Sequence, residues 1–221
     1  MRDHRRILIT GASKGLGAVL CQSFPDDEVI AYTRKECDFL KLDEWNHDLS
    51  VDVAIHCAGG GLGLRDPDPP SKALYDLFMT NLGGAAEINR VIMPGMKVNG
   101  WGRIVHVCSI ASGEAVGSVG YNMVKAGLAA YVRSLGREMA HSGIVVSGIA
   151  PGAFQAPGNA MERLKMNHPE AYMDFLTTRL PRKKMGDAAE LVPLIRFLCS
   201  DDASMMGGCV VPIDAGEGIY Y

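Results

Sequence analysis

The sequence predicts a doubly wound α/β fold, in which helices cover both faces of a parallel sheet of about seven strands. Two observations support this prediction. Short apolar runs of strand length alternate with amphipathic segments of helix length along the 221 residues. The first apolar run leads into a glycine-rich turn and then a helix, as in many parallel α/β sheets. We expect one domain over 1–221, since no repeat, linker or second core is evident.

The composition is typical of a soluble globular protein, with 48% hydrophobic and 21% charged residues. A net charge of −3 does not indicate a nucleic-acid surface. No apolar run approaches the ~20 residues that cross a bilayer. The six cysteines form no Cys-x-x-Cys pair, and the six histidines show no ligand spacing. We therefore expect a cytoplasmic protein without a disulfide framework, a metal site or a membrane partner.

The first unit of the chain is a strand at 6–10, a glycine-rich turn and a helix at 16–24. Glycines allow a sharp turn and a close approach of the backbone to a ligand, and a helix N-terminus favours phosphate. This order predicts a Rossmann-type phosphate cradle, although a glycine-rich turn alone is weak evidence. The predicted cofactor-binding residues of this turn are Gly11, Ser13, Lys14, Gly15, Leu16 and Gly17.

The second strand, 28–33, ends in Arg34 and Lys35. In dinucleotide folds an acid at this strand end holds the ribose 2′-hydroxyl, whereas an arginine accommodates a 2′-phosphate. Arg34 therefore predicts a preference for NADP(H), with NAD(H) possible, while a solvated charge cluster is the alternative. Glu36 falls beyond the tip, but the short segment that follows could bring it back toward the ribose.

The next stretch predicts a short edge strand at 37–40, a helical turn at 43–49 and a buried strand at 51–57. The last of these ends in the glycine-rich run 58–61, where a cofactor could lie against the backbone. Ala58 and Gly59 are the predicted cofactor contacts there. Three prolines and two aspartates predict an exposed loop at 62–70.

A long amphipathic helix is predicted at 71–98, broken near Gly83, with Asn81 as a polar exception. A strand at 102–108 runs into Ser109, and a helix follows at 121–141. Tyr121 and Lys125 are four residues apart and share one face of this helix. An ammonium near a phenol favours the ionised phenol, which suits proton transfer. A surface tyrosine above a solvated lysine is the alternative.

The remaining chain predicts a strand at 144–150, a turn at Pro151 and Gly152, a helix at 187–199 and a strand at 210–213. Residues 152–186 between them predict a substrate lid with one or two short helices. The lid is either a solvated amphipathic cover or the mouth for an anionic substrate. Its apolar and basic candidates are Met161, Met166, Met173, Phe175, Arg163, Lys165, Arg179, Arg182, Lys183 and Lys184.

Taken in order, these motifs resemble the short-chain dehydrogenase/reductase family in its short single-domain form, and 3-oxoacyl-carrier-protein reductases in particular. The resemblance covers nearly the whole chain. It rests on Thr10-Gly11-x-x-x-Gly15-x-Gly17, Cys57-Ala58-Gly59, Asn81, Ser109, Tyr121-x-x-x-Lys125, Pro151-Gly152 and Ile213-Asp214-Ala215-Gly216.

The resemblance implies hydride transfer between a nicotinamide cofactor and a carbonyl or secondary alcohol, most simply in a ketoreductase. It implies Tyr121 as proton donor, Ser109 on the carbonyl oxygen, Lys125 on the ribose hydroxyls and Asn81 on a water that relays protons. Pro151 and Gly152 would contact the cofactor. Such a substrate could be carrier-bound or anionic.

Several positions depart from the family pattern. His56 stands where asparagine is usual, and Ala215 replaces a common glycine. The spacing from Ser109 to Tyr121 is one residue short, so Ser112 is a second candidate for the serine. The region after the second strand is abbreviated, and Asp38 is assigned to adenine by position only.

Two other functions remain open: an isomerase or dehydratase on the same scaffold, and a non-catalytic NADP(H) sensor. A sensor would not need the serine, tyrosine and lysine together. The helices at 71–98 and 121–141 have apolar residues on more than one face, which predicts a homodimer or homotetramer.

Overall fold

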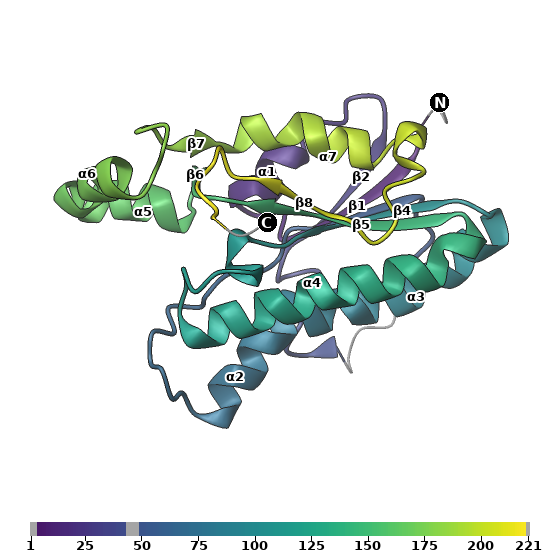
Figure 1. Cartoon of the computed structure of the whole chain (residues 1–221). Helices are drawn as coiled ribbons and strands as arrows, with labels where there is room; N and C mark the ends of the chain where they lie inside the picture. Colours follow the sequence, from purple (N-terminus) through teal and green to yellow (C-terminus); the bar gives the residue numbers. More distant parts are fainter. Residues whose placement is uncertain (1–3, 43–48, 220–221) are drawn as a thin grey trace.

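A computed structural model describes residues 4–42 and 49–219. Six parallel strands form one sheet in the order β2-β1-β3-β4-β5-β8, which confirms the predicted fold class (Figure 1). The sheet strands are β1 (Arg6–Thr10), β2 (Glu28–Tyr32), β3 (Val53–His56), β4 (Gly102–Val107), β5 (Ile144–Pro151) and β8 (Val210–Ile213). The strand order reverses beside β1, so the carboxyl ends of β1 and β3 border a crevice suited to a ligand.

Helices cover both faces of the sheet, as Figure 1 shows. On one face, α1 (Gly15–Leu20) and α7 (Val192–Leu198) pack on β1 and β3. On the other, α3 (Gly84–Asn99) packs on β1, β3 and β4, and α4 (Val119–Met139) lies beside it. The two faces bury separate apolar clusters, as expected for a parallel sheet covered on both sides.

The predicted edge strand at 37–40 is wrong, and the described residues form a sheet of six strands where about seven were expected. Residues 38–41 form a turn in which the Asp38 carboxylate accepts from the Leu40 N–H at 3.0 Å. Phe39 packs against Gly84, where an added Cβ would lie 2.1 Å from the Phe39 ring. This side-chain contact and the turn are thus formed in place of backbone hydrogen bonds to a neighbouring strand. The helical turn expected at 43–49 falls almost wholly outside the described residues.

The helix expected at 71–98 is not broken at Gly83. A single π-helical turn, Met79–Gly83, joins α2 (Ser71–Phe78) to α3. Asn81 lies in this turn and is 2% exposed. A π-turn inserted in an α-helix is frequent at functional sites, so the polar exception of the sequence coincides with a local change of hydrogen bonding.

The segment 152–186 contains two short helices, α5 (Ala160–Asn167) and α6 (Pro169–Thr178), as expected. Two short strands, β6 (Phe154–Gln155) and β7 (Gly186–Asp187), pair in parallel and join its two ends. Tyr172, Leu180 and Met185 form a small apolar cluster of its own. The segment projects from the carboxyl end of the sheet as a separate lobe (Figure 1).

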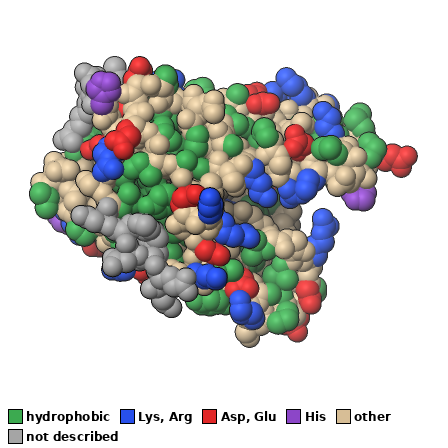
Figure 2. Space-filling view, turned by 180° about the vertical axis from the view of Figure 1, so that it is seen from behind, with side chains coloured by type: hydrophobic (Ala, Val, Ile, Leu, Met, Phe, Trp, Pro, Cys, Tyr) green, Lys and Arg blue, Asp and Glu red, His purple; other side chains and the backbone are tan. Residues whose placement is uncertain are grey.

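The surface shows no segregation of charge on the face drawn in Figure 2, where acidic and basic side chains are interspersed. This pattern agrees with a net charge of −3. Among the described residues, no helix has the length and apolar character to cross a bilayer.

Candidate active site

The glycine-rich turn approaches the end of β3 closely. Gly11 has a φ of 69°, and a Cβ added there would lie 2.6 Å from the Ala58 backbone nitrogen. A Cβ on Gly17 would lie 2.4 Å from the Gly11 carbonyl oxygen. Both contacts are with backbone, which cannot move aside cheaply. Glycine is therefore required at these two positions by the close packing of β1, α1 and β3.

Three other glycines leave open space. A Cβ on Gly15, Gly60 or Gly61 would meet no described atom within 4 Å. Ser13 and Lys14 are exposed beside this space. A backbone that turns without side chains next to an exposed ammonium fits the pyrophosphate of a dinucleotide. The residues present thus fit the cofactor that the sequence predicts.

The lid contacts the glycine-rich turn directly. The Gly15 N–H donates to the Pro157 carbonyl at 2.7 Å. A Cβ on Gly158 would lie 3.4 Å from the Lys14 side chain. The Asn159 side chain donates to the Phe154 carbonyl at 2.7 Å and caps α5. Residues 157–159 therefore connect the lid to the predicted phosphate cradle.

Asn81 holds the glycine-rich end of β3. Its Oδ1 accepts from the Gly60 N–H at 2.9 Å, and its Nδ2 donates to the Gly60 and Leu77 carbonyls at 3.0 and 2.9 Å. A Cβ on Gly59 would lie 2.8 Å from Asn81 Oδ1 and 3.4 Å from Lys125 Nζ. The structure thus brings Gly59, Asn81 and Lys125 together.

Lys125 is a buried cation beneath Tyr121. Its side chain is on α4, is only 3% exposed, and donates from Nζ to the Val107 carbonyl at 2.8 Å. Lys125 Nζ lies 5.7 Å from the centre of the half-buried Tyr121 ring. A solvated lysine, the alternative interpretation of this spacing, does not agree with this burial. Burying an ammonium is costly unless it is used or paired.

The two candidate serines have different surroundings. Ser109 caps a short 3₁₀ turn, and its Oγ accepts from the Ala111 N–H at 3.1 Å, which leaves its O–H available to donate. The Ser112 hydroxyl instead donates to the Lys125 carbonyl at 3.0 Å. Ser112 thus supports the backbone of α4, and Ser109 is the better candidate for a contact with substrate.

The tip of β2 presents charges of both signs. Arg34 and Lys35 are exposed there. Glu36 turns back to accept from the hydroxyl and from the N–H of Thr33, the latter at 3.0 Å. These hydrogen bonds, from the hydroxyl above all, lower the pKa of the Glu36 carboxyl. A carboxylate therefore lies closer to the strand tip than its place in the sequence suggests. The Asp38 carboxylate is turned into its own loop.

The C-terminal turn packs on the loop that follows β5. A Cβ on Gly152 would lie 2.6 Å from a Glu217 carboxylate oxygen, which also accepts from the Ala153 N–H at 2.6 Å. Ala215, where relatives commonly have glycine, has a φ of 55°. This backbone conformation explains the glycine that is usual at this position.

An arginine of the lid joins two buried carboxylates at this rim. Arg179 donates to Glu114 and Glu217, with distances of 3.4 and 3.3 Å. Glu114 belongs to the loop before Tyr121, and both carboxylates are under a tenth exposed. The sequence analysis missed both acids, because their pairing joins segments that are 65 and 38 residues from Arg179.

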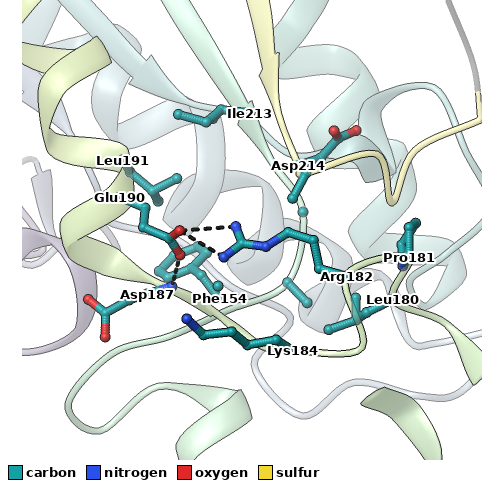
Figure 3. Close-up of a pocket in the computed structure, with 14 residues that line it drawn as sticks. Phe154, Leu180, Pro181, Arg182, Lys184, Asp187, Glu190, Leu191, Ile213 and Asp214 are labelled. Atoms are coloured by element: carbon teal, nitrogen blue, oxygen red, sulfur yellow. Dashed lines mark hydrogen bonds and ion pairs between the residues drawn. The ribbon is translucent and has the colours of Figure 1, made fainter. Parts of the chain in front are cut away.

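A pocket lies between the lid and the carboxyl end of β8 (Figure 3). Arg182 donates to Glu190 from two nitrogens at 3.0 Å, and Glu190 accepts from the Asp187 N–H at 2.8 Å. Lys184 also lines the pocket. Of the predicted catalytic and cofactor-binding residues, only Gly152 borders it.

Most basic side chains of the lid are engaged within the lid or its rim. Besides Arg179 and Arg182, Arg163 and Lys183 donate to backbone carbonyls at 2.5 Å, and Lys165 lies over the Tyr172 ring. Among the apolar candidates, Met161 and Phe175 pack in the lid core, whereas Met166 and Met173 are exposed. The geometry favours a cover with its own core over a ready anion site.

A buried polar cluster also escaped the sequence analysis. His56, Asn89 and His106 lie between the sheet and α3, and none is more than 4% exposed. Only His56 gave a signal in the sequence, as a departure from the family pattern at a strand end. Asn89 and His106 gave no signal in the sequence, because their hydrogen-bond partners are distant in the chain.

A parallel sheet with an open glycine-rich turn, and a buried lysine near a half-buried tyrosine, are the features expected of a dinucleotide-dependent oxidoreductase. Comparison with known proteins agrees. A family model described as enoyl-(acyl carrier protein) reductase matches residues 43–217. Levodione reductase from Leifsonia aquatica is 33% identical over 226 residues, covering 97% of this chain and 85% of the relative. The 3-oxoacyl-[acyl-carrier-protein] reductase MabA from Mycobacterium avium is 26% identical, covering 97% and 90%.

Solved structures show the same fold. The crystal structure of levodione reductase has a TM-score of 0.80 at 25% identity and covers 100% of both chains. A putative 2-deoxy-d-gluconate 3-dehydrogenase from Agrobacterium tumefaciens, with bound NADP, has a TM-score of 0.83 at 22% identity and covers 96% of both. This chain belongs to the short-chain dehydrogenase/reductase family and is an NAD(P)-dependent oxidoreductase.

Proposed function

We propose that the protein is an NADP(H)-dependent ketoreductase in which Tyr121 is the proton donor. One observation carries the proposal: a buried Lys125 ammonium, anchored on the Val107 carbonyl, lies 5.7 Å from the centre of the Tyr121 ring. Ser109 follows Val107 by two residues and has a hydroxyl proton to donate. Together these groups can hold a carbonyl oxygen and protonate it.

The cofactor would lie along the carboxyl ends of the strands. Gly11 and Gly17 shape the turn, and the open space at Gly15 and Gly60 admits the phosphates. Ala58, Gly59, Pro151 and Gly152 border the same edge of the sheet, and Ser13, Lys14 and Leu16 belong to the turn. Lys125 would hold the ribose hydroxyls. When bound, the reduced nicotinamide supplies a hydride to the substrate carbonyl carbon.

Side chains of the protein bind the substrate oxygen and transfer the proton. Ser109 donates a hydrogen bond to the carbonyl oxygen and stabilises the negative charge that develops there. Tyr121 transfers its phenol proton to that oxygen, which completes a secondary alcohol. Lys125 stabilises the resulting phenolate. Asn81 Oδ1 accepts one hydrogen bond from Gly60 and retains a lone pair for a water that returns a proton.

The test is a panel of carbonyl compounds, with consumption of reduced nicotinamide measured by absorbance. Consumption of one cofactor per product formed supports a reductase. Product formed without net cofactor consumption would indicate an isomerase or a dehydratase. Cofactor binding without turnover on any compound would indicate a sensor. Because the family model's description names an enoyl group, matched enones and ketones belong in the panel.

The substrate is a small carbonyl or alcohol compound, as for the family. We place uncharged ketones first, because Arg163, Arg179, Arg182 and Lys183 are already bound to other groups in the protein. A carrier-bound or anionic substrate would have to displace these contacts. Carrier-type thioesters and sugar acids form the second group of the panel.

The cofactor preference gives a first prediction. We expect Arg34→Ala to lower the preference for NADPH over NADH, in kcat/KM, by about ten- to a hundred-fold, because a guanidinium contact with a 2′-phosphate contributes roughly 1.5–3 kcal/mol. Lys35→Ala is the matched control. Glu36→Gln should improve the use of NADPH if the carboxylate repels the phosphate. If the wild type prefers NADH, Glu36 binds the adenine ribose and the proposed role of Arg34 is refuted.

The oligomeric state gives a second prediction. Large apolar side chains are exposed where α2 meets α4, namely Tyr75, Phe78, Val119 and Met123 at 55%, 41%, 59% and 52%. Burying such a patch favours self-association through a two-fold contact. We expect light scattering to give a dimer or tetramer at micromolar concentration. A mass near 23.7 kDa would contradict this.

We also assign the protein to the cytoplasm. All six cysteines are free thiols. Burial raises the pKa of Cys37 and Cys108 to about 11 and that of Cys199 to about 12, which keeps them as unreactive thiols. A chain with this use of cysteine fits a reducing compartment.

A further inference from the structure

A chain of hydrogen bonds joins four polar side chains beneath the active site. His56 Nε2 donates to Asn89 Oδ1 at 2.9 Å. Asn89 Nδ2 donates to His106 Nε2 at 3.3 Å and to the Tyr131 hydroxyl at 3.1 Å. The His56 and His106 rings stack with their centres 4.7 Å apart. Their strands, β3 and β4, are paired in register at these two residues.

This pattern assigns the protons. Asn89 Oδ1 can only accept, so His56 carries its proton on Nε2. Asn89 Nδ2 can only donate, so His106 Nε2 is unprotonated and its proton is on Nδ1. Neither His56 Nδ1 nor His106 Nδ1 has a hydrogen-bond partner among the described residues. His106 is therefore neutral, because its Nε2 carries no proton. His56 is also neutral, because a second proton on its buried Nδ1 would have no described acceptor. Each ring leaves one buried nitrogen unsatisfied.

The arrangement is poorly suited to stability alone. A buried nitrogen without a partner costs about 1–3 kcal/mol, whereas apolar side chains of the same shape would fill the space without this cost. The neighbouring core is apolar, with Leu8, Ala54 and Ile104 buried on the same face of the sheet. Two histidines and an asparagine at this position therefore need a reason other than packing.

The positions of His56 and His106 in the chain indicate a reason for this polar cluster. His106 directly precedes Val107, whose carbonyl holds the Lys125 ammonium. His56 is followed four residues later by Gly60, whose N–H and carbonyl are both bound by Asn81. The cluster thus lies immediately before the two strand ends that hold Lys125 and Asn81.

We propose that His56, Asn89 and His106 are positioning residues: by remaining uncharged and hydrogen-bonded, they hold the ends of β3 and β4 so that Lys125 and the Gly59–Gly60 turn can bind the cofactor. The inference rests on the proposed function in one respect, namely that Lys125 and this turn contact the cofactor. It concerns the residues behind that contact, which hold no cofactor themselves.

Protonation would break the cluster. A proton on His106 Nε2 would face the Asn89 amide donor, and a proton on His56 Nδ1 would have no described acceptor. The charged and titratable groups facing the cluster are the Lys125 ammonium and the Tyr131 hydroxyl on α4, with Glu87 of α3 beyond Tyr131. The ammonium opposes a second positive charge. Burial lowers the pKa of His56 to about 4 and lowers that of His106 below its usual range.

The first experiment measures the ring nitrogens of the wild type by ¹⁵N NMR, without cofactor or substrate. We expect both histidines to be neutral at about pH 6, with the proton on Nε2 of His56 and on Nδ1 of His106. A protonated ring at this pH would overturn the proposal. So would a proton on Nε2 of both rings or on Nδ1 of both rings, because the Asn89 amide could not then hydrogen-bond to both histidines in either orientation. The result does not depend on whether the protein reduces ketones.

The second experiment compares His56→Leu with His56→Gln. The glutamine amide nitrogen can take the place of His56 Nε2 and donate to Asn89, whereas leucine fills a similar volume without a hydrogen bond. We expect His56→Gln to bind NADPH within about threefold of wild type and His56→Leu to bind about tenfold more weakly, as the loss of one positioning hydrogen bond implies. His56→Leu removes the unpaired His56 Nδ1 but leaves Asn89 Oδ1 without its donor, so we expect a melting temperature close to that of wild type. A folded His56→Leu that binds NADPH like wild type would refute the positioning role.

Asn89→Asp provides a third measurement. A carboxylate beside the two rings favours their charged forms, so it should raise the pKa of both histidines by about one to three units. If the cluster positions the site, NADPH affinity falls over the same pH interval in which the histidines titrate by NMR. An affinity that stays constant through that titration would overturn the proposal. A wild type that binds no nicotinamide cofactor would refute the proposed function, while the tautomers still test the cluster.

Discussion

Replacing Tyr121 by phenylalanine is expected to lower turnover by about 10²–10⁴-fold and to leave cofactor binding nearly intact. Only the phenol oxygen is removed, so the ring still lies over Lys125, whose ammonium remains bound to the Val107 carbonyl. The hydride donor and the Ser109 hydroxyl are unchanged. The loss should therefore appear in kcat, while the dissociation constant of NADPH stays close to that of wild type.

Tyr75→Phe is the matched control, because Tyr75 is 55% exposed on α2 and belongs to no proposed catalytic contact. It should leave kcat within about twofold of wild type, as expected for a surface substitution. Turnover of Tyr121→Phe near the wild-type rate would contradict the assignment of the proton donor. A large loss of NADPH affinity in Tyr121→Phe would instead assign the phenol to binding.

The fold was predictable where the signal is local. Each sheet strand is a short, predominantly apolar run, and each, β8 included, pairs with buried or half-buried apolar residues of a neighbouring strand. The glycine-rich turn was found for the same reason, since Gly11 and Gly15 both have a positive φ within one five-residue interval. Short-range spacing carries this information directly.

The errors arose where tertiary contacts override local pattern. The apolar run at 37–40 suggested a strand, but Phe39 packs on Gly84, which is 45 residues away, and the backbone turns. Two adjacent glycines suggested a helix break, yet a π-turn continues the helix, and Gly84 is buried against the same Phe39 ring. This long-range contact has no signature within either segment.

The candidate site divides in the same way. Tyr121 and Lys125 share a helix, so their proximity follows from spacing. The choice between Ser109 and Ser112 does not, because it depends on which hydroxyl the Lys125 carbonyl engages, and the structure selects Ser112 for that structural bond. The partner of Asn81 and the buried His56–Asn89 contact required the fold as well.

Gly11→Ala is expected to lower the free energy of unfolding by about 2–5 kcal/mol and to weaken NADPH binding. The left-handed φ of 69° costs a non-glycine residue about 1–2 kcal/mol. The added Cβ would lie 2.6 Å from the Ala58 nitrogen, and overpacking of this kind costs about 1–3 kcal/mol more. Relief requires β1 and β3 to separate at their carboxyl ends, where we propose that the cofactor binds. Urea unfolding measures the first effect, and fluorescence titration with NADPH measures the second.

Gly15→Ala separates the two causes. Gly15 has a similar φ of 62°, but a Cβ there meets no described atom within 4 Å. Its unfolding free energy should therefore fall by only about 1–2 kcal/mol, the cost of the left-handed conformation. NADPH affinity should fall strongly all the same, because the methyl group enters the space proposed for the pyrophosphate. If Gly15→Ala binds NADPH like wild type, the phosphates lie elsewhere. If both variants lose equal stability, the contact between Gly11 and Ala58 is not what requires glycine at the end of β1.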